Sequence, residues 1–357
     1  MILARIEALS RERERESRMR FHNTYDLIIS VDNLLAAWQE FLRGKRKRKD
    51  VEVFALNLLD NIISLHKDLA NKTYRHSSYT AFKISDPKPR DIHKASVRDR
   101  LLHHAIYRIL YPQLDKKFIF DSFSCRREKG THKAINQFRK YVGIVSRNHN
   151  KTAWVLKCDI RKFFASINHN ILLDILSHKI KDHDTVKLFG QIIRSFHTER
   201  NPGVGLPLGN LTSQLLVNVY MNEFDHFVKR ELKIKYYIRY ADDFVILQND
   251  KMILQDMLPK ISEFLENKLK LQLHPNKVFI KTIASGVDFL GWVHFSHHRV
   301  PRTSTKRRML KNLDKNSTKA SLASYEGLLS HGNTYKLRKI INNRARIPPQ
   351  TPPAGGI

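Results

Sequence analysis

Two adjacent carboxylates, Asp242 and Asp243, interrupt an apolar and aromatic stretch that runs from Tyr236 to Leu247. The flanking residues favour strands, so the pattern predicts a β-hairpin with both aspartates at its tip. Consecutive strand residues point to opposite faces, and the two carboxylates are therefore not expected to do the same job. An Asp-Asp pair alone is typical of an ordinary turn, because aspartate is a preferred turn residue. The apolar flanks are what favour a functional position here.

A third carboxylate, Asp159, ends a separate apolar segment, Trp154–Ile160, which we predict to be a short strand. Charges beside buried strands are unfavourable unless something pairs them. A divalent cation is a natural partner, since magnesium takes oxygen ligands and keeps waters and phosphate oxygens in its remaining positions. Two such ions roughly 3.5–4 Å apart assist in-line phosphoryl displacement. Acidic strand ends in a very basic chain therefore indicate nucleotidyl transfer.

The charge balance points to a polyanionic partner. The 357 residues include 64 Lys and Arg against 34 Asp and Glu, which gives a net charge of +30. Nucleic acid is the commonest partner of such a surface, and an anionic membrane is the rival. No apolar run has the length needed to span a bilayer, and the N-terminal residues lack a signal-peptide pattern. We therefore expect a nucleic-acid partner, no membrane, and a cytoplasmic location.

The two cysteines, Cys125 and Cys158, form no metal-ligand or disulfide pattern. We expect both to be small, buried, apolar residues in a reducing compartment.

Apolar periodicity predicts a mixed α and β chain. Helices are expected over residues 1–75, 211–232, 251–271 and 306–346, with the basic run Arg43–Lys49 on the surface of the first region. Residues 80–150 are expected to hold short strands, loops and one helix around Leu101–Leu110. Strands are expected over 278–296, and the Pro- and Gly-rich end, 348–357, is expected to be disordered.

Tyr240-Ala241-Asp242-Asp243 resembles the tyrosine–x–aspartate–aspartate box of reverse transcriptases. Further segments resemble the neighbouring boxes of that family in the expected order, and such co-occurrence is far more specific than one motif. These segments are Asp121–Arg126 (fingers), Leu156–Phe164 (first catalytic box), Gly205–Gln214 (nucleotide and template box), Leu273–Lys277 and Phe289–Trp292 (primer grip).

The resemblance implies an α+β right-hand polymerase with fingers, a palm made of an antiparallel sheet backed by helices, and a helical thumb. The implied boundaries are a helical extension at 1–75, fingers at 76–150, a palm at 151–296 with part of the fingers inserted, a thumb at 297–347 and a tail at 348–357.

The resemblance also implies roles for individual residues. Asp159, Asp242 and Asp243, with the main-chain carbonyl of Ile160, would hold two magnesium ions, for which manganese can substitute, and Lys277 would protonate the pyrophosphate. The nucleotide-binding residues would be Arg90, Arg126, Phe164, Leu208 and Gly209. Phe164 resembles a steric gate against a ribose 2′-hydroxyl, and Phe163 is the expected core residue. Template or primer contacts would come from Tyr240, Ser213, Gln214, Gly291 and Trp292. Substrates would be dNTPs, template RNA and the RNA–DNA hybrid.

Leu208 and Gln214 depart from the commonest nucleotide box, which has glutamine and proline at these positions. Together with Ser324–Gly327 and His331–Tyr335 they resemble the reverse transcriptases of diversity-generating retroelements. That resemblance implies error-prone copying of a template-repeat RNA, mutagenic retrohoming of the cDNA into a target gene, and a basic accessory variability protein. Losing the glutamine removes a polar group that orients the nucleotide, which makes reduced fidelity plausible.

Several alternatives stay open. Retron, phage-defence and group II intron reverse transcriptases share much of the core. The other classes are a non-catalytic RNA-binding or splicing factor, an RNA-dependent RNA polymerase, and a generic basic nucleic-acid-binding protein. The three aspartates disfavour the first, Phe164 the second, and the ordered boxes the third.

Overall fold

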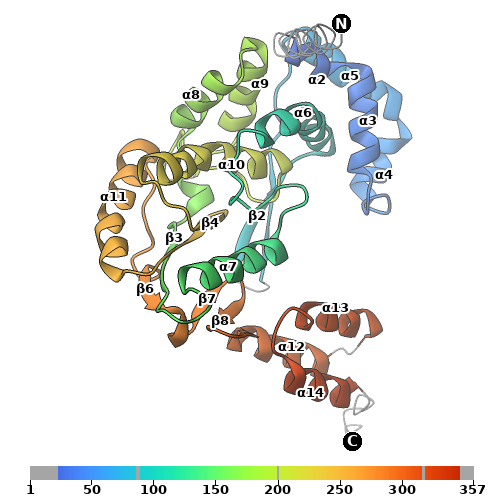
Figure 1. Cartoon of the computed structure of the whole chain (residues 1–357). Coiled ribbons are helices and arrows are strands. Elements are labelled where there is room, and N and C mark those ends of the chain that lie inside the picture. Colours follow the sequence, from blue (N-terminus) through green and yellow to red (C-terminus); the bar gives the residue numbers. More distant parts are fainter. Residues whose placement is uncertain (1–22, 86–88, 199–200, 316–317, 346–357) are drawn as a thin grey trace, which may run out of the picture.

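A four-stranded antiparallel sheet with the order β4-β5-β3-β6 carries the acidic residues (Figure 1). The computed structural model describes residues 23–85, 89–198, 201–315 and 318–345. The strands of this sheet are β3 (Trp154–Asp159), β4 (Tyr237–Tyr240), β5 (Asp243–Gln248) and β6 (Phe279–Thr282). The predicted strand and hairpin are therefore confirmed, with the hairpin closed between β4 and β5.

Alternating residues of the strands face two hydrophobic cores. Leu156, Cys158 and Phe244 belong to the larger core, which includes buried residues of α10 (Leu211–His226) and α11 (Lys251–Leu269). Val155, Val245 and Leu247 face the second core, against α7 (Thr131–Val145). By this alternation Lys157, Asp159 and Asp243 lie on the second face, the one that α7 covers in part.

The remaining helices surround this sheet. At the N-terminal side lie α2 (Thr24–Ile29), α3 (Val31–Phe41), α4 (Lys49–Leu56), α5 (Leu58–Ala70) and α6 (Val97–Asp115). Between β3 and α10 lie the 3-10 turn η1 (Phe163–Ser166), α8 (His169–Lys179) and α9 (His183–Arg194), and the π-helical turn η2 (Phe227–Glu231) extends α10. The C-terminal helices are α12 (Thr303–Lys315), α13 (Lys319–Leu329) and α14 (Tyr335–Ala345), which share a small core of their own.

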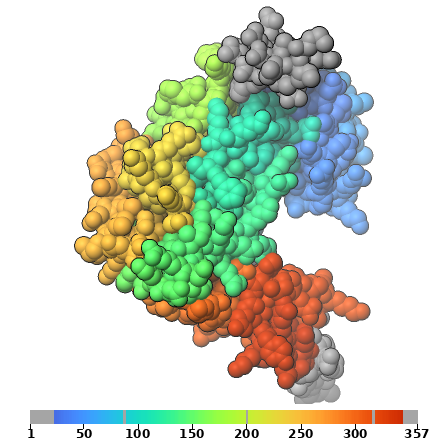
Figure 2. All heavy atoms as spheres, in the orientation of Figure 1, coloured from blue at the N-terminus to red at the C-terminus, as the bar shows by residue number. Residues whose placement is uncertain are grey.

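Two smaller sheets complete the fold. The hairpin β1 (Thr80–Ile84) and β2 (Arg90–Lys94) lies before α6. The strands β7 (Val287–Phe289), β8 (Trp292–His294) and β9 (Arg299–Pro301) follow the 3-10 turn η3 (Ile283–Ser285) and lead into the C-terminal helices. Figure 2 shows a hollowed face between the α3–α4 region and the α12–α14 helices.

The structure corrects three expectations. Residues 80–150 hold two helices rather than one, because α7 buries Ala134, Phe138 and Val142 at helical spacing. The first of the two, α6, is longer than expected, since its start is capped by Ser96. Cys125 is exposed, whereas Cys158 is buried as expected, and both are free thiols.

The expected helix within residues 1–22 and the expected disorder of 348–357 lie outside the described residues. In the part that is described, no helix combines the length and apolar character needed to cross a bilayer.

Candidate active site

Main-chain pairing brings the three aspartates together. Asp159, at the end of β3, lies directly opposite Asp243, the first residue of β5. The amide of Ile160 donates to the main-chain carbonyl of Asp242 at 3.1 Å, which fixes the hairpin tip against the end of β3. The other side of Asp159 is also held, because its carbonyl accepts from the amide of His274 at 2.7 Å. Three segments distant in sequence therefore meet at this point.

Two lysines reach the carboxylates from opposite sides. Lys277 Nζ lies 2.9 Å from Asp159 Oδ1, and Lys157 Nζ lies 3.4 Å from Asp243 Oδ2. Lys277 is partly exposed, whereas Lys157 is buried in the sheet. Lys277, which is predicted to protonate the pyrophosphate, is thus a cation beside the carboxylate of Asp159. Lys157 was missed from the sequence because only the strand register places it near Asp243.

The tip of the hairpin is held from behind by Arg239, which the sequence also did not single out. Ala241 adopts φ +58°, a left-handed conformation that non-glycine residues enter rarely. Arg239 Nη1 donates to the Ala241 carbonyl at 3.1 Å, and its guanidinium forms a two-pronged pair with Asp225, at 2.7 Å for each contact. The fully buried ion pair thus connects α10 to the turn that presents Asp242.

Burial and mutual repulsion disfavour the charged forms of the tip carboxylates. Burial, and then the charge of Asp159, raise the pKa of Asp242, against the lowering effects of Lys277 and Arg90. Burial raises the pKa of Asp243 to about 7, with Asp242 and Asp159 adding to the rise and Lys157 opposing it. Asp243 Oδ1 is buried and has no hydrogen-bond partner among the described residues. A bound cation would relieve both conditions.

The donor set fits magnesium but does not form a closed cage. In the described ranges no three His, Cys, Asp or Glu side chains are arranged to hold a metal by themselves. Magnesium is usually held by one or two carboxylates, and waters and substrate phosphates supply its other ligands. By the resemblance Asp159 and Asp242, with the carbonyl of Ile160, would hold such an ion, and main-chain pairing places Asp243 opposite Asp159 as the third acidic neighbour.

Replacing Asp243 with asparagine is expected to stabilise the metal-free protein. The folded pKa of about 7 lies above the unfolded value of about 3.9, so the carboxyl group costs stability increasingly between about pH 4 and pH 7 and reaches a plateau above that range. Asp243→Asn should therefore raise the free energy of unfolding at pH 8, by an amount on the order of 2 kcal/mol.

Urea denaturation in EDTA at pH 4 and pH 8 measures this effect. The exposed Asp256 on α11, changed to asparagine, is the matched control. A difference between Asp243→Asn and the unchanged protein that does not grow with pH would contradict the assignment.

The β1–β2 hairpin is fastened to the predicted nucleotide box. The His93 amide donates to the Leu208 carbonyl at 3.0 Å, and Asn210 Nδ2 donates to the His93 carbonyl at 2.8 Å. Gly209 has φ +104°, and a Cβ there would lie 2.8 Å from Ile92, so this close approach requires glycine. The fastening carries Arg90, at the start of β2, close enough for its charge to lower the pKa of Asp242. Leu208 is half-buried and adds no polar side chain.

Phe164 lies next to the same box. Its carbonyl accepts from the Leu206 amide at 2.8 Å, and its ring is partly buried. The adjacent Phe163 is a core residue, as expected.

Arg126, the predicted triphosphate contact, has internal partners in the structure. Its guanidinium is nearly buried and donates to Asp115 Oδ1 at 2.7 Å and to the carbonyls of Ile119 and Ser122 at 2.6 and 2.9 Å. Through these contacts Arg126 stabilises the segment that joins α6 to α7. The triphosphate contact of Arg126 stays a prediction, and a phosphate there would compete with these partners for the guanidinium.

The predicted template and primer residues are divided between surface and core. Tyr240 is half-buried, and its hydroxyl accepts from Thr131 Oγ1 at 3.1 Å. Ser213 is buried in the first turn of α10, and Gln214 is half-buried beside it. Gly291, at φ +85°, forms the tip of the β7–β8 turn. Trp292 is buried, whereas Gly291 beside it is half-buried.

Trp292 instead packs under the His331–Tyr335 segment. A Cβ on Gly332 would lie 2.1 Å from the Trp292 ring, so only glycine fits there. The His331 ring stacks on His132 of α7 at 3.8 Å, and the Asn333 amide donates to the Arg299 carbonyl at 2.8 Å. The segment therefore joins the C-terminal helices to the central region.

Comparisons with known proteins identify the family of this chain. The family model described as reverse transcriptase (RNA-dependent DNA polymerase) matches residues 83–294, which is more than half of the chain. Protein YkfC of Escherichia coli K12 is 25% identical over 284 residues, which cover 69% of this chain and 72% of that protein. The group II intron-encoded protein LtrA of Lactococcus lactis is 23% identical over 293 residues, which cover 63% of this chain. This chain spans about half, 47%, of the length of LtrA.

A solved structure supports the fold. The apo telomerase of Candida tropicalis superimposes with a TM-score of 0.51 at 12% identity, covering 76% of this chain and 57% of that one. The predicted α+β right-hand polymerase fold is confirmed. With the three aspartates meeting at one hairpin inside the matched region, the chain belongs to the reverse transcriptase family of RNA-dependent DNA polymerases.

Proposed function

We propose that this RNA-directed DNA polymerase makes cDNA by two-metal-ion nucleotidyl transfer and copies a template-repeat RNA with frequent errors, as in a diversity-generating retroelement. The observation that carries the catalytic part is the meeting of Asp159, Asp242 and Asp243, with Lys277 2.9 Å from Asp159. The proposed boundaries of fingers, palm and thumb remain those given by the motifs. We propose that the enzyme acts in the cytoplasm.

The roles follow from the positions of the side chains. Bound magnesium would lower the pKa of the primer hydroxyl and stabilise the charge on the phosphates. The primer 3′-hydroxyl loses its proton to water, and its oxygen bonds to the α-phosphorus of a dNTP as the bond from that phosphorus to the pyrophosphate oxygen breaks. Lys277 donates a proton to the departing pyrophosphate, and Arg90 offers its positive charge on the dNTP side of Asp242. Asp159 and Asp242 hold the reacting centre in line.

Primer extension on a heteropolymer RNA template tests the proposal. The reaction contains magnesium and either dNTPs or rNTPs, and the cDNA is sequenced. The control is the doubly substituted Asp242→Ala/Asp243→Ala chain. Extension with dNTPs only, lost in the control, is the expected result, with errors concentrated at template adenines. Extension without such errors would refute the retroelement part alone. The absence of extension, with or without a basic partner protein, would refute the proposed polymerase activity.

Replacing Phe164 with alanine is expected to weaken the choice of dNTP over rNTP by at least about tenfold, because the aromatic ring would no longer exclude a 2′-hydroxyl. The measurement is kcat/KM for dATP and for ATP on the same primer and template. The matched control is Phe163→Leu, which changes a neighbouring core ring. Equal loss of both activities in Phe164→Ala would show a packing role instead of a gate.

The interpretation as a retroelement enzyme rests on Leu208 and on the segment His331–Tyr335. Leu208 places an apolar side chain where the commonest box has glutamine, so an amide that would orient the base pair is missing. Leu208→Gln is therefore expected to lower the error frequency at template adenines by at least about threefold. Sequencing of cDNA from both chains measures it. Unchanged error spectra would remove Leu208 as the cause.

A group II intron-type enzyme is the second candidate, because LtrA is a group II intron-encoded protein with detectable similarity. Retron and phage-defence enzymes remain further alternatives within the family. The error spectrum separates the first candidate from these, since accurate copying would favour an intron type. The proposed partners are template RNA, the RNA–DNA hybrid and a basic accessory protein.

A further inference from the structure

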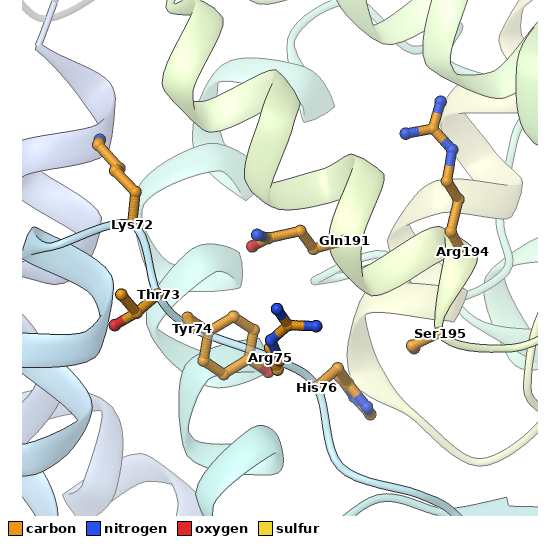
Figure 3. A pocket seen from close by; sticks show the side chains of 8 residues that line it. All are labelled: Lys72, Thr73, Tyr74, Arg75, His76, Gln191, Arg194 and Ser195. Atoms are coloured by element: carbon orange, nitrogen blue, oxygen red, sulfur yellow. The ribbon is translucent and has the colours of Figure 1, made fainter.

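The segment that joins α5 to β1 and helix α9 form a cationic pocket away from the aspartates. Its volume is about 760 Å³. Figure 3 shows the lining side chains on two segments of the chain. The lining residues are Lys72, Thr73, Tyr74, Arg75, His76, Gln191, Arg194 and Ser195.

Two polar contacts, one at each end of the pocket, hold its walls together. Lys72 Nζ lies 2.9 Å from Asp184 Oδ2 in the first turn of α9. The Tyr79 hydroxyl lies 2.9 Å from Ser195 Oγ at the other end of the same helix. The pocket is therefore preformed and does not depend on a ligand to bring its walls together.

The floor is also fixed. Asp99 is fully buried and accepts from the Tyr74 hydroxyl at 2.7 Å and from the Ser77 amide at 3.1 Å. The His76 ring stacks on Tyr79 at 4.8 Å. This network fixes the segment to α6. The basic side chains of the segment therefore extend from a rigid backbone.

Three side chains between these two contacts are free to bind a ligand. Arg75, Gln191 and Arg194 are exposed, and in the described part of the chain the structure gives their side chains no hydrogen bond or ion pair. Asp184, the acid beside the pocket, is already engaged by Lys72. Two guanidinium groups and an amide, with no free carboxylate among the lining residues, are suited to a phosphate group.

The pocket is connected to the nucleotide box by ring contacts. Tyr79 contacts the edge of Phe196 at 5.6 Å, and Phe196 contacts His93 at 4.7 Å. His93 is the residue whose amide donates to the Leu208 carbonyl. Tyr79, which contacts Ser195 of the pocket, is therefore connected through Phe196 and His93 to the nucleotide box. The volume lies in the range of roughly 300–1,000 Å³ typical of small-ligand sites, which admits a nucleotide unit but not a duplex.

We propose that the pocket of Arg75, Gln191 and Arg194 binds the phosphate backbone of a single-stranded segment of the RNA that this polymerase copies. The identity of that RNA rests on the proposed function, whereas the binding itself does not. A second source of the same chemistry is a free nucleotide, and the experiment distinguishes the two.

The test compares Arg75→Gln/Arg194→Gln with Lys260→Gln/Lys268→Gln, which removes the same charge from the exposed surface of α11. Fluorescence anisotropy with a labelled single-stranded RNA 20-mer is measured from 50 to 300 mM salt. Losing two phosphate contacts should reduce the slope of log K against log salt by about 1.4 and weaken binding about 25-fold at 0.1 M salt. The control should change affinity by no more than about threefold.

A crosslinking arm uses the unsubstituted chain, so it holds even if the variant does not fold. RNA carrying 4-thiouridine is irradiated with the protein, and peptides from residues 72–76 and 191–195 are expected among the crosslinked products. Crosslinks confined to other regions, together with a variant that binds like its control, would overturn the proposal. Calorimetry with ATP is the third arm, and ATP binding lost in the variant while RNA binding is kept would overturn it in favour of a free nucleotide.

The outcome is independent of catalysis. Failure of the chain to make cDNA would refute the polymerase proposal but leave binding and crosslinking to test the pocket.

Discussion

Replacing Asp242 with asparagine is expected to lower kcat for dNTP addition by about 10³-fold or more, which corresponds to roughly 4 kcal/mol of lost transition-state stabilisation. Asp242 lies at the hairpin tip, where Asp159 approaches it and both Lys277 and Arg90 act on its charge. The amide keeps the size of the side chain and removes its negative charge. Because pairing in the main chain holds the tip, the turn itself should persist.

Single-turnover extension with increasing dNTP separates the chemical step from binding. The apparent affinity for the primer–template should change little, since phosphate contacts of the whole basic surface supply it. Asp256→Asn removes the same charge from an exposed position on α11 and should keep full activity. A loss for Asp242→Asn of less than about tenfold would show that the proposed metal-binding role is wrong.

The parts of the site that local sequence determines could be predicted. The hairpin around Asp242 and Asp243 follows from the apolar and aromatic residues that flank them, and β3 ends at Asp159 as expected. The helix predicted over 211–232 is present as α10, which buries Leu216, Tyr220 and Phe224, because helical spacing places these three residues close together.

The parts that depend on distant pairing could not be predicted. Lys157 and Arg239 are ordinary basic residues in the sequence, and only the register of β3 and β5 and the packing of α10 give them partners. Arg126 shows the converse, since its motif fits a phosphate contact but Asp115, eleven residues earlier, already occupies its guanidinium. In a chain with a charge of +30, sequence alone does not show which cations are engaged by acids.

Among the ion pairs that the sequence did not reveal, the pair of Arg239 and Asp225 should matter most for stability. The Arg239 guanidinium is fully buried and contacts Asp225, Asn218, Ser122 and the Ala241 carbonyl. Arg239→Gln would leave Asp225 as a buried charge without its cation, which typically costs 3–5 kcal/mol. The free energy of unfolding should therefore fall by roughly that amount, with a loss of soluble protein at 37 °C.

The double variant Asp225→Asn/Arg239→Gln separates stability from positioning. Neutralising both partners removes the unpaired charge, and the asparagine oxygen can still accept from the Tyr237 hydroxyl, which lies 2.7 Å from Asp225 Oδ1. At least about 2 kcal/mol of the lost stability should return. Activity should not return with it, because the Ala241 carbonyl has lost its donor in the turn that carries Asp242. We expect kcat about tenfold below that of the unchanged chain with KM for dNTP little altered, measured by primer extension beside urea denaturation. Full recovery of kcat in the stable double variant would limit Arg239 to a structural role, and a single variant as stable as the unchanged chain would contradict the buried pair itself.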